Sequence, residues 1–172
     1  MVGNGVRRLI ERAIPSESRS DEIIDHLLES FKEYYDQHLC DRTVPYPGIT
    51  PLLEELRHRG VALAVASNKY ESAVKQLIAH FFPGIEFASV CGNIEGYPRK
   101  PDPSIVFRVL SDAPTPKAEV LYVGDSAVDI ETARRACVDS VAVSWGFRPM
   151  HELASANPTY IISATADLLP LI

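Results

Sequence analysis

Residues 120–136 read VLYVGDSAVDIETARRA, and this stretch decides the fold class. The run VLYV at 120–123 is short and apolar, which is typical of a strand buried on both faces of a parallel sheet. Residues 127–136 are predicted to form a helix, and Gly124 gives the backbone room where the strand ends. A buried strand that leads directly into a helix is one unit of an α/β fold.

The same alternation of strand and helix continues on both sides of this stretch. We predict further strands at 61–66, 87–90, 140–143 and 160–162. We also predict a helix that begins at Pro51 after the N-cap Thr50 and stops at Gly60, further helices at 70–80 and 103–112, and a terminal helix. The predicted fold class is therefore α/β, with a doubly wound, mostly parallel sheet. In such folds ligands collect at the carboxyl ends of the strands.

Residues 1–44 contain no strand signal and are predicted to form a separate helical part. A short apolar helix pattern ends before Pro15, and a longer amphipathic helix follows Ser20, a plausible N-cap. The turn Tyr46-Pro47-Gly48 then leads into the alternating pattern. The expected organisation is a helical part at 1–44 and an α/β core at 45–172.

Composition excludes several classes of function. The formal net charge of -6 and the pI of about 5.3 provide no basic surface for a nucleic-acid backbone. No run approaches the roughly 20 apolar residues that a membrane span requires. Cys40, Cys91 and Cys137 lie far apart and form neither a zinc motif nor an even disulfide set. We therefore expect a cytoplasmic protein with no nucleic-acid partner and no membrane association.

Two polar clusters lie where a strand or loop leads into a helix. Ser67 and Asn68 follow the apolar run at 61–66, so backbone N–H groups and a hydroxyl could bind a phosphoryl group there. Alternatively, both residues simply cap the next helix. Lys100 precedes Pro101, which restrains the backbone and fixes the cation, although a solvated lysine in a proline-rich loop would look the same.

The third cluster directly follows the strand at 120–123. Asp125 and Asp129 are four residues apart at a predicted helix start, so both carboxylates could face one point. Two such carboxylates suit a hard cation such as Mg2+, which also keeps several water ligands. The plainer alternative is that the acidic residues only complement the helix dipole. Their position after a buried strand favours a metal site.

The order of these clusters resembles the haloacid dehalogenase superfamily. Ser67-Asn68, Lys100-Pro101 and the stretch GDSAVDIETARRA are similar to its second, third and fourth motifs. The flanking segments YPGITPLLEELRHRG, GYPRKPDP and VSWGF are similar to its phosphoglycolate phosphatase branch. The helical residues 1–44 look like part of that branch's small cap.

The resemblance implies an enzyme, a Mg2+-dependent phosphatase acting on a small phosphorylated substrate, most simply 2-phosphoglycolate. Ser67 would bind the phosphoryl group with help from the Asn68 backbone, and Lys100 would stabilise its charge. Asp125 would bind Mg2+, and Asp129 would support the metal directly or through water. The cap would cover the site and select the substrate.

One motif of the family has no counterpart in these 172 residues. The family carries a DxDx(T/V) motif, with the attacking aspartate, on a strand before the cap, but no two aspartates here are two positions apart. We therefore expect an N-terminally truncated phosphatase whose core lacks a strand in the middle of the sheet, and which is inactive by itself. The alternative is a non-catalytic pseudo-phosphatase that binds phosphate or a protein. The oligomeric state stays open, with association through an exposed sheet edge as one route.

Overall fold

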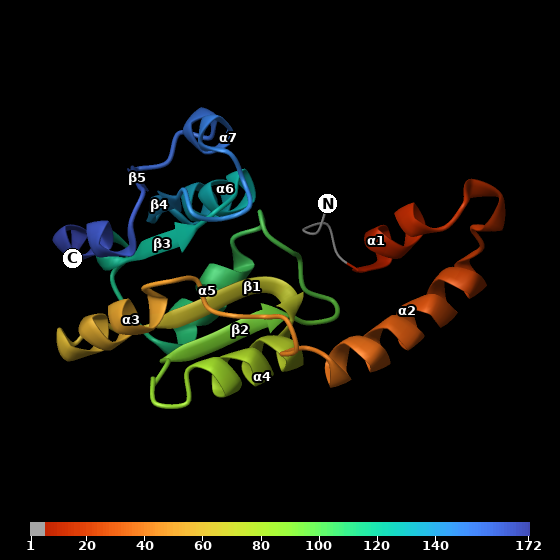
Figure 1. Ribbon diagram of the computed structural model, residues 1–172. Helices are drawn as coiled ribbons and strands as arrows, with labels where there is room; N and C mark the ends of the chain where they lie inside the picture. The colour runs from red at the N-terminus through yellow and green to blue at the C-terminus, as the bar shows by residue number, and fades with distance from the viewer. Residues whose placement is uncertain (1–5) are drawn as a thin grey trace. The chain divides into compact units, whose positions relative to one another are not determined.

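The computed structural model describes residues 6–172, and the chain divides into two compact units between Val44 and Pro45 (Figure 1). The first unit contains helix α1 (Val6–Ala13), a 3-10 turn η1 (Ser16–Ser18) and the long helix α2 (Asp21–Gln37). The Ser20 hydroxyl accepts a hydrogen bond from the Ile23 N–H at 3.2 Å, which confirms Ser20 as the N-cap of α2.

Helices α1 and α2 each bury an isoleucine, and ion pairs join them. Ile10 of α1 and Ile24 of α2 are both buried. Arg7 of α1 donates to Asp21 at 2.6 Å and also bonds Asp25, both of which lie in the first turns of α2. Exposed pairs of this kind add little stability, so the burial of apolar side chains contributes more within this unit.

The second unit alternates strands and helices, as its sequence predicts. Its elements are α3 (Ile49–His58), β1 (Ala64–Tyr70), α4 (Glu71–Phe81), β2 (Ser89–Asn93), α5 (Ser104–Asp112), η2 (Lys117–Glu119), β3 (Leu121–Gly124), α6 (Ala127–Ala136), β4 (Asp139–Val143), α7 (Met150–Ser155), β5 (Tyr160–Ile162) and η3 (Thr165–Leu171). All strand pairs are parallel, which confirms the α/β class and the parallel arrangement.

The strands form two sheets instead of one continuous sheet. One sheet contains β1 and β2, and the other has the order β3-β4-β5. Strands β1 and β3 each pair with one neighbour, so each of these sheets has a free edge there. Figure 1 shows β1 beside β2, with α4 along the outer side of β2.

Helices cover both faces of the strands in the second unit. On one face, α3, β4 and β5 contribute to a cluster of buried residues: Leu52, Leu56, Leu63, Val141, Val143, Ile162 and Leu168. On the other face, β2, α5 and α6 contribute Cys91, Ile105, Val106, Ala133, Ala136 and Val138. These two apolar layers join the two sheets into one unit, because each cluster contains residues from both halves of residues 45–172.

Several predicted boundaries are wrong. The strand predicted at 61–66 begins at Ala64 and continues to Tyr70, with an irregular register after Ala66. The helix predicted to begin at Pro51 after Thr50 as its N-cap begins instead at Ile49, after Gly48 in a left-handed conformation (φ 81°). Helix α7 was not predicted, and the last element is a 3-10 helix. Among residues 6–172, no helix combines the length and apolar character needed to cross a membrane.

Candidate active site

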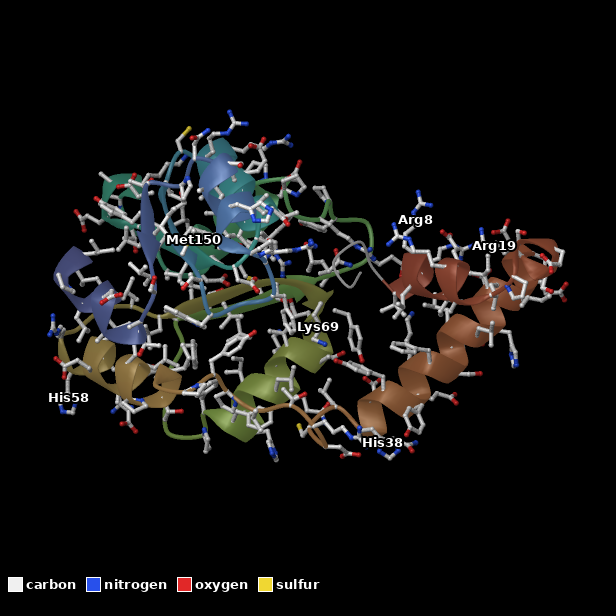
Figure 2. The ribbon with its side chains drawn as sticks, turned by 45° about the horizontal axis from the view of Figure 1, so that its top comes forward. Arg8, Arg19, His38, His58, Lys69 and Met150 are labelled. Carbon is white, nitrogen blue, oxygen red and sulfur yellow. The ribbon has the colours of Figure 1, made fainter. Side chains whose placement is uncertain are left out.

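Ser67 and Asn68 lie within the irregular end of β1, not in a loop after it. The register with β2 shifts between Ala66 and Tyr70, so the backbone at Ser67 and Asn68 leaves the regular ladder. The Ser67 hydroxyl accepts a hydrogen bond from the Lys69 N–H at 3.2 Å. Figure 2 shows Lys69 at this end of β1. The local turn therefore presents a hydroxyl and backbone N–H groups at the carboxyl end of the strand.

Asn68 holds the backbone of Lys100 by two hydrogen bonds. The Lys100 N–H donates to Asn68 Oδ1 at 2.8 Å, and Asn68 Nδ2 donates to the Lys100 carbonyl at 3.2 Å. The peptide bond between Lys100 and Pro101 is cis. The Asn68 side chain thus fixes the loop that carries Lys100 to the end of β1.

The Lys100 ammonium bridges β1 and α6. Its Nζ donates to the Ala66 carbonyl at 3.0 Å and to Asp129 Oδ1 at 2.7 Å, and both charged side chains are only 11% exposed. Burial lowers the pKa of Lys100, but the nearby Tyr122 and Asp129 outweigh it, so the pKa lies above the ordinary value. Lys100 is therefore a buried, charged group under neutral conditions.

Both carboxylate oxygens of Asp129 have partners. Oδ1 accepts from Lys100, and Oδ2 accepts from the Ser126 hydroxyl at 2.6 Å. Ser126 is also the N-cap of α6. A Cβ atom at Gly124 would lie 2.3 Å from the Cβ of Asp129, so a residue with a side chain there would displace the aspartate. Asp129 is thus built into the site as the partner of Lys100.

Asp125 lies at the junction of β3 and α6 and is held by a different loop. The Phe147 N–H donates to Asp125 Oδ2 at 3.0 Å, and a Cβ at Gly146 would lie 2.2 Å from the Cβ of Asp125. Burial raises the pKa of Tyr46, and the negative charge of Asp125 raises it further. The Asp125 carboxylate is thus fixed by the loop that carries Gly146 and Phe147.

Asp125 and Asp129 are the carboxylates of the candidate site that could bind a metal ion. Residues 6–172 contain no group of three or more His, Cys, Asp or Glu side chains arranged to hold one. Mg2+ does not need such a group, because it is often bound by one or two carboxylates and completes its shell with water and substrate oxygens. Asp125 fits this role, whereas Asp129 fits a supporting role, since Lys100 and Ser126 occupy both of its oxygens.

The structure joins part of the predicted site directly. Asn68, Lys100 and Asp129 are connected by hydrogen bonds, and Ser67 and Asp125 are their near neighbours in sequence. A small cavity of about 10 Å³, roughly one water in size, is lined by Ser67 and Asn68 but not by Lys100, Asp125 or Asp129. Convergence of all five residues on one pocket stays a prediction.

Sequence reasoning missed the residues that hold the aspartates in place. Gly146 and Phe147 contact Asp125, and Ser126 contacts Asp129. A polar residue before a helix is a recognisable N-cap signal, so Ser126 could have been found. The segment VSWGF, which contains Gly146 and Phe147, carries only a family resemblance, and nothing in its spacing indicates that it lies against Asp125.

Known proteins resemble this chain over most of its length. A sequence profile of the haloacid dehalogenase-like hydrolases matches residues 1–143. A phosphoglycolate phosphatase from Pseudomonas savastanoi is 34% identical over 173 residues, which cover 98% of this chain and 63% of the relative. One from Mesorhizobium japonicum is 34% identical over 164 residues, with coverage of 94% and 72%. The chain thus spans under two thirds of the length of the first relative.

Solved structures show the same fold. The crystal structure of a "predicted phosphoglycolate phosphatase" from Haemophilus somnus has a TM-score of 0.87 at 28% identity, covering 99% of this chain and 78% of that one. A "predicted phosphatase" from Clostridium acetobutylicum has a TM-score of 0.82 at 20% identity, covering 98% and 77%, which supports the fold alone. From the profile match and these relatives, the chain belongs to the haloacid dehalogenase-like hydrolase family.

Proposed function

We propose that one site in this chain is the phosphate-binding and cation-binding part of a Mg2+-dependent phosphatase that hydrolyses a small phosphate monoester. The residues of this site are Ser67, Asn68, Lys100, Asp125 and Asp129. The observation that carries the proposal is the hydrogen-bonded connection from Asn68 through Lys100 to Asp129, which links three sequence clusters. The first candidate substrate is 2-phosphoglycolate, because relatives with 34% identity are named phosphoglycolate phosphatase.

The phosphoryl group would be bound at the end of β1. The Ser67 hydroxyl and the backbone N–H of Asn68 supply hydrogen bonds for its oxygens. The Lys100 ammonium lies next to this turn, since it donates to the Ala66 carbonyl at 3.0 Å. A buried cation so close to the transferring group would offset the negative charge that develops on the oxygens.

Asp125 would hold the metal ion, with Asp129 in support. Mg2+ bound there would offset charge on the phosphoryl oxygens and orient them. The chain's own contribution is to fix the Asp125 carboxylate through the Phe147 N–H, with Gly146 packed against it. Asp129 keeps Lys100 charged and in place. Residues 1–44 would act as a cap that covers the site.

The attacking group is the part of the reaction that these residues do not supply. No two aspartates in the 172 residues are two positions apart, so the carboxylate nucleophile implied by the resemblance has no counterpart. Bound phosphate ester could then react only with water. Binding and charge stabilisation without a nucleophile still leave about 10³ to 10⁴-fold acceleration over water in another hydrolase, far below enzymatic rates. This observation also favours the second candidate, a non-catalytic phosphate-binding module.

Calorimetric titration with inorganic phosphate and Mg2+ tests the binding part of the proposal. The 172-residue chain should bind phosphate, Ser67→Ala and Lys100→Met should weaken phosphate binding, and Asp125→Asn should weaken Mg2+ binding. Lys117→Met is the matched control, because the Lys117 Nζ lies over the ring of Phe107, 4.9 Å from its centre, and Lys117 is not part of the proposed site. If the folded wild-type chain bound neither phosphate nor Mg2+, the proposal would be wrong.

A turnover assay tests whether the chain is catalytic by itself. With Mg2+ and 2-phosphoglycolate, the 172-residue chain should show no turnover approaching the ~10 s⁻¹ typical of enzymes. Turnover at that rate would mean that another residue attacks phosphorus, and it would rule out the non-catalytic candidate. Phosphate binding without turnover would support a binding site that lacks its nucleophile.

A further inference from the structure

The water-sized cavity beside Ser67 is also lined by a cation that the proposed function does not use. The lining includes Ser67, Asn68, Asn93, Tyr97 and Arg108, but not Lys100. Among residues 6–172, Arg108 is the charged residue that lines this cavity. Because Ser67 and Arg108 both line a space of only about 10 Å³, one small ligand can contact both residues. The position of Arg108 therefore bears on which phosphate esters the site accepts.

Arg108 of α5 is held by β2, by α4 and by the loop that follows β2. Its Nη1 donates to the Gly92 carbonyl at 3.0 Å, and its Nη2 donates to Glu71 Oε2 at 2.6 Å. Its Cζ lies 5.5 Å from the centre of the Tyr97 ring. The side chain is 25% exposed, so a ligand can reach it from solvent. A guanidinium fixed in this way loses little conformational freedom when it binds an anion.

Glu71 neutralises Arg108 only in part, because Lys75 shares the same carboxylate. Lys75 Nζ donates to Glu71 Oε1 at 2.7 Å, while Arg108 donates to Oε2. Hydrogen bonds from Lys75 and Arg108 lower the pKa of Glu71 to about 2, and the hydrogen bond to Glu71 raises the pKa of Arg108. Glu71 and Arg108 are therefore both charged at neutral pH. One carboxylate between two cationic side chains leaves the local charge positive, which favours a second anion at this place.

We propose that Arg108 is a specificity-determining residue, which selects phosphate monoesters that carry a carboxylate close to the phosphoryl group. The inference rests on the proposed function and deepens it, because it explains why 2-phosphoglycolate would be preferred to an uncharged ester. In that molecule only one oxygen and one methylene separate phosphorus from the carboxylate, so with its phosphoryl group at Ser67 it reaches only a neighbouring cation. The cavity has room for one carboxylate oxygen in place of a water. The planar donors of arginine match a carboxylate.

Binding of two phosphate esters to the 172-residue chain tests this selection. Ethyl phosphate and 2-phosphoglycolate share the phosphoryl group and a two-carbon chain, and they differ in the carboxylate. With Mg2+ present, calorimetric titration should show that the wild-type chain binds 2-phosphoglycolate about tenfold more tightly, the effect of one hydrogen bond between charged groups. In Arg108→Gln this preference should disappear, while the affinity for ethyl phosphate stays at the wild-type value. Lys75→Gln is the matched control, because Lys75 donates to the same Glu71 carboxylate but does not line the cavity, and it should keep the preference.

Two outcomes of the titration would overturn the role of Arg108 and leave the proposed function standing. One is a wild-type chain that binds both esters equally well, and the other is a folded Arg108→Gln that keeps the wild-type preference. If the wild-type chain bound neither ester nor inorganic phosphate, the proposed function would fail and the inference with it. Should Arg108→Gln not fold, nitrogen-15 NMR of the wild-type chain decides. The Arg108 Nε–H signal should shift with 2-phosphoglycolate but not with ethyl phosphate, and equal shifts would contradict the selection.

Discussion

Two glycines leave the space that the aspartates of the site occupy. A Cβ at Gly124 would lie 2.3 Å from the Cβ of Asp129, and a Cβ at Gly146 would lie 2.2 Å from the Cβ of Asp125. Neither glycine has a positive φ, so the requirement is for space and not for an unusual backbone. Glycine at these positions therefore serves the placement of the carboxylates.

Gly146→Ala should weaken Mg2+ binding by displacing Asp125. The added methyl group would meet both the Cβ and Oδ2 of Asp125 at under 2.5 Å, so the carboxylate must move. Changes in groups that hold a metal ligand in place cost about 10 to 100-fold in affinity. Calorimetric titration with Mg2+ measures this loss. Gly84→Ala is the control, because nothing lies within 4 Å of its added Cβ, and equal Mg2+ affinity in both variants would contradict the role of Gly146.

Glu71 is the charged residue whose ionisation should matter most for acid stability. Hydrogen bonds from Lys75 and Arg108 lower the pKa of Glu71 from 4.5 to about 2. The distances are 2.7 Å from Lys75 Nζ and 2.6 Å from Arg108 Nη2, and Arg108 also donates to the Gly92 carbonyl at 3.0 Å. These contacts tie the start of α4 to the end of β2, next to Ser67.

Glu71→Gln should therefore destabilise the protein at neutral pH but not in strong acid. A carboxyl with a lowered pKa stabilises the fold above pH 4.5 and loses that effect as the pH falls through about 2. We expect a loss on the order of 1 kcal/mol at pH 7, since one side of the pair is exposed to solvent. Urea unfolding from pH 7 to pH 2.5 measures the difference. Glu54→Gln, an exposed residue on α3, should show no such trend, and a pH-independent loss in Glu71→Gln would contradict the assignment.

At the level of elements, the sequence pattern predicts the bounds of some helices and strands of the second unit correctly. Helix α6 and strand β5 have the predicted bounds, because an apolar strand with a polar cap and a helix of small residues gives a clear local signal. The bounds of strand β1 differ from the prediction because its end is set by pairing with β2. Tyr70 pairs with Asn93 of β2 after an irregularity in the register. Such pairing is a tertiary property that local pattern cannot show.

The sequence indicates which residues are candidates for the site, but it does not predict the hydrogen bonds among them. Ser67, Asn68, Lys100, Asp125 and Asp129 stand out by their place after strands and before helices. The bonds from Asn68 to the Lys100 backbone and from Phe147 to Asp125 join segments 32 and 22 residues apart, and no spacing rule predicts them. The resemblance already implies different roles for Asp125 and Asp129, and the structure adds the partners of the two Asp129 oxygens, Lys100 and Ser126.

The segment between α2 and α3 should be the first place where a protease cuts. Residues 41–44 are exposed, they carry no regular structure that extends into either helix, and the two compact units meet there in sequence. Limited trypsin treatment should cleave after Arg42 and release a resistant fragment that begins at Thr43. Mass spectrometry identifies the cut. Arg42→Gln should remove this product, and early cleavage within residues 45–172 would contradict the compactness of the second unit.

For the whole molecule, the division of the strands into two sheets has a consequence for association. Strands in parallel sheets are normally buried on both faces, yet Val123 of β3 is 44% exposed. Strands β1 and β3 each have an unpaired edge. Unpaired backbone groups beside an exposed apolar side chain favour pairing with another chain. We therefore expect self-association of the 172-residue chain through these edges.

Val123→Lys should suppress that association. A lysine on an edge strand hinders pairing because the docking of a second strand would bury its charge. Sedimentation velocity should show wild-type chains associating as their concentration rises, and Val123→Lys should remain monomeric over the same range. Val44→Lys is the matched control, because Val44 is 79% exposed but lies outside the strands, and it should associate like the wild type. A wild-type chain that is monomeric at all concentrations, or equal association in both variants, would show that the edges of β1 and β3 are not used.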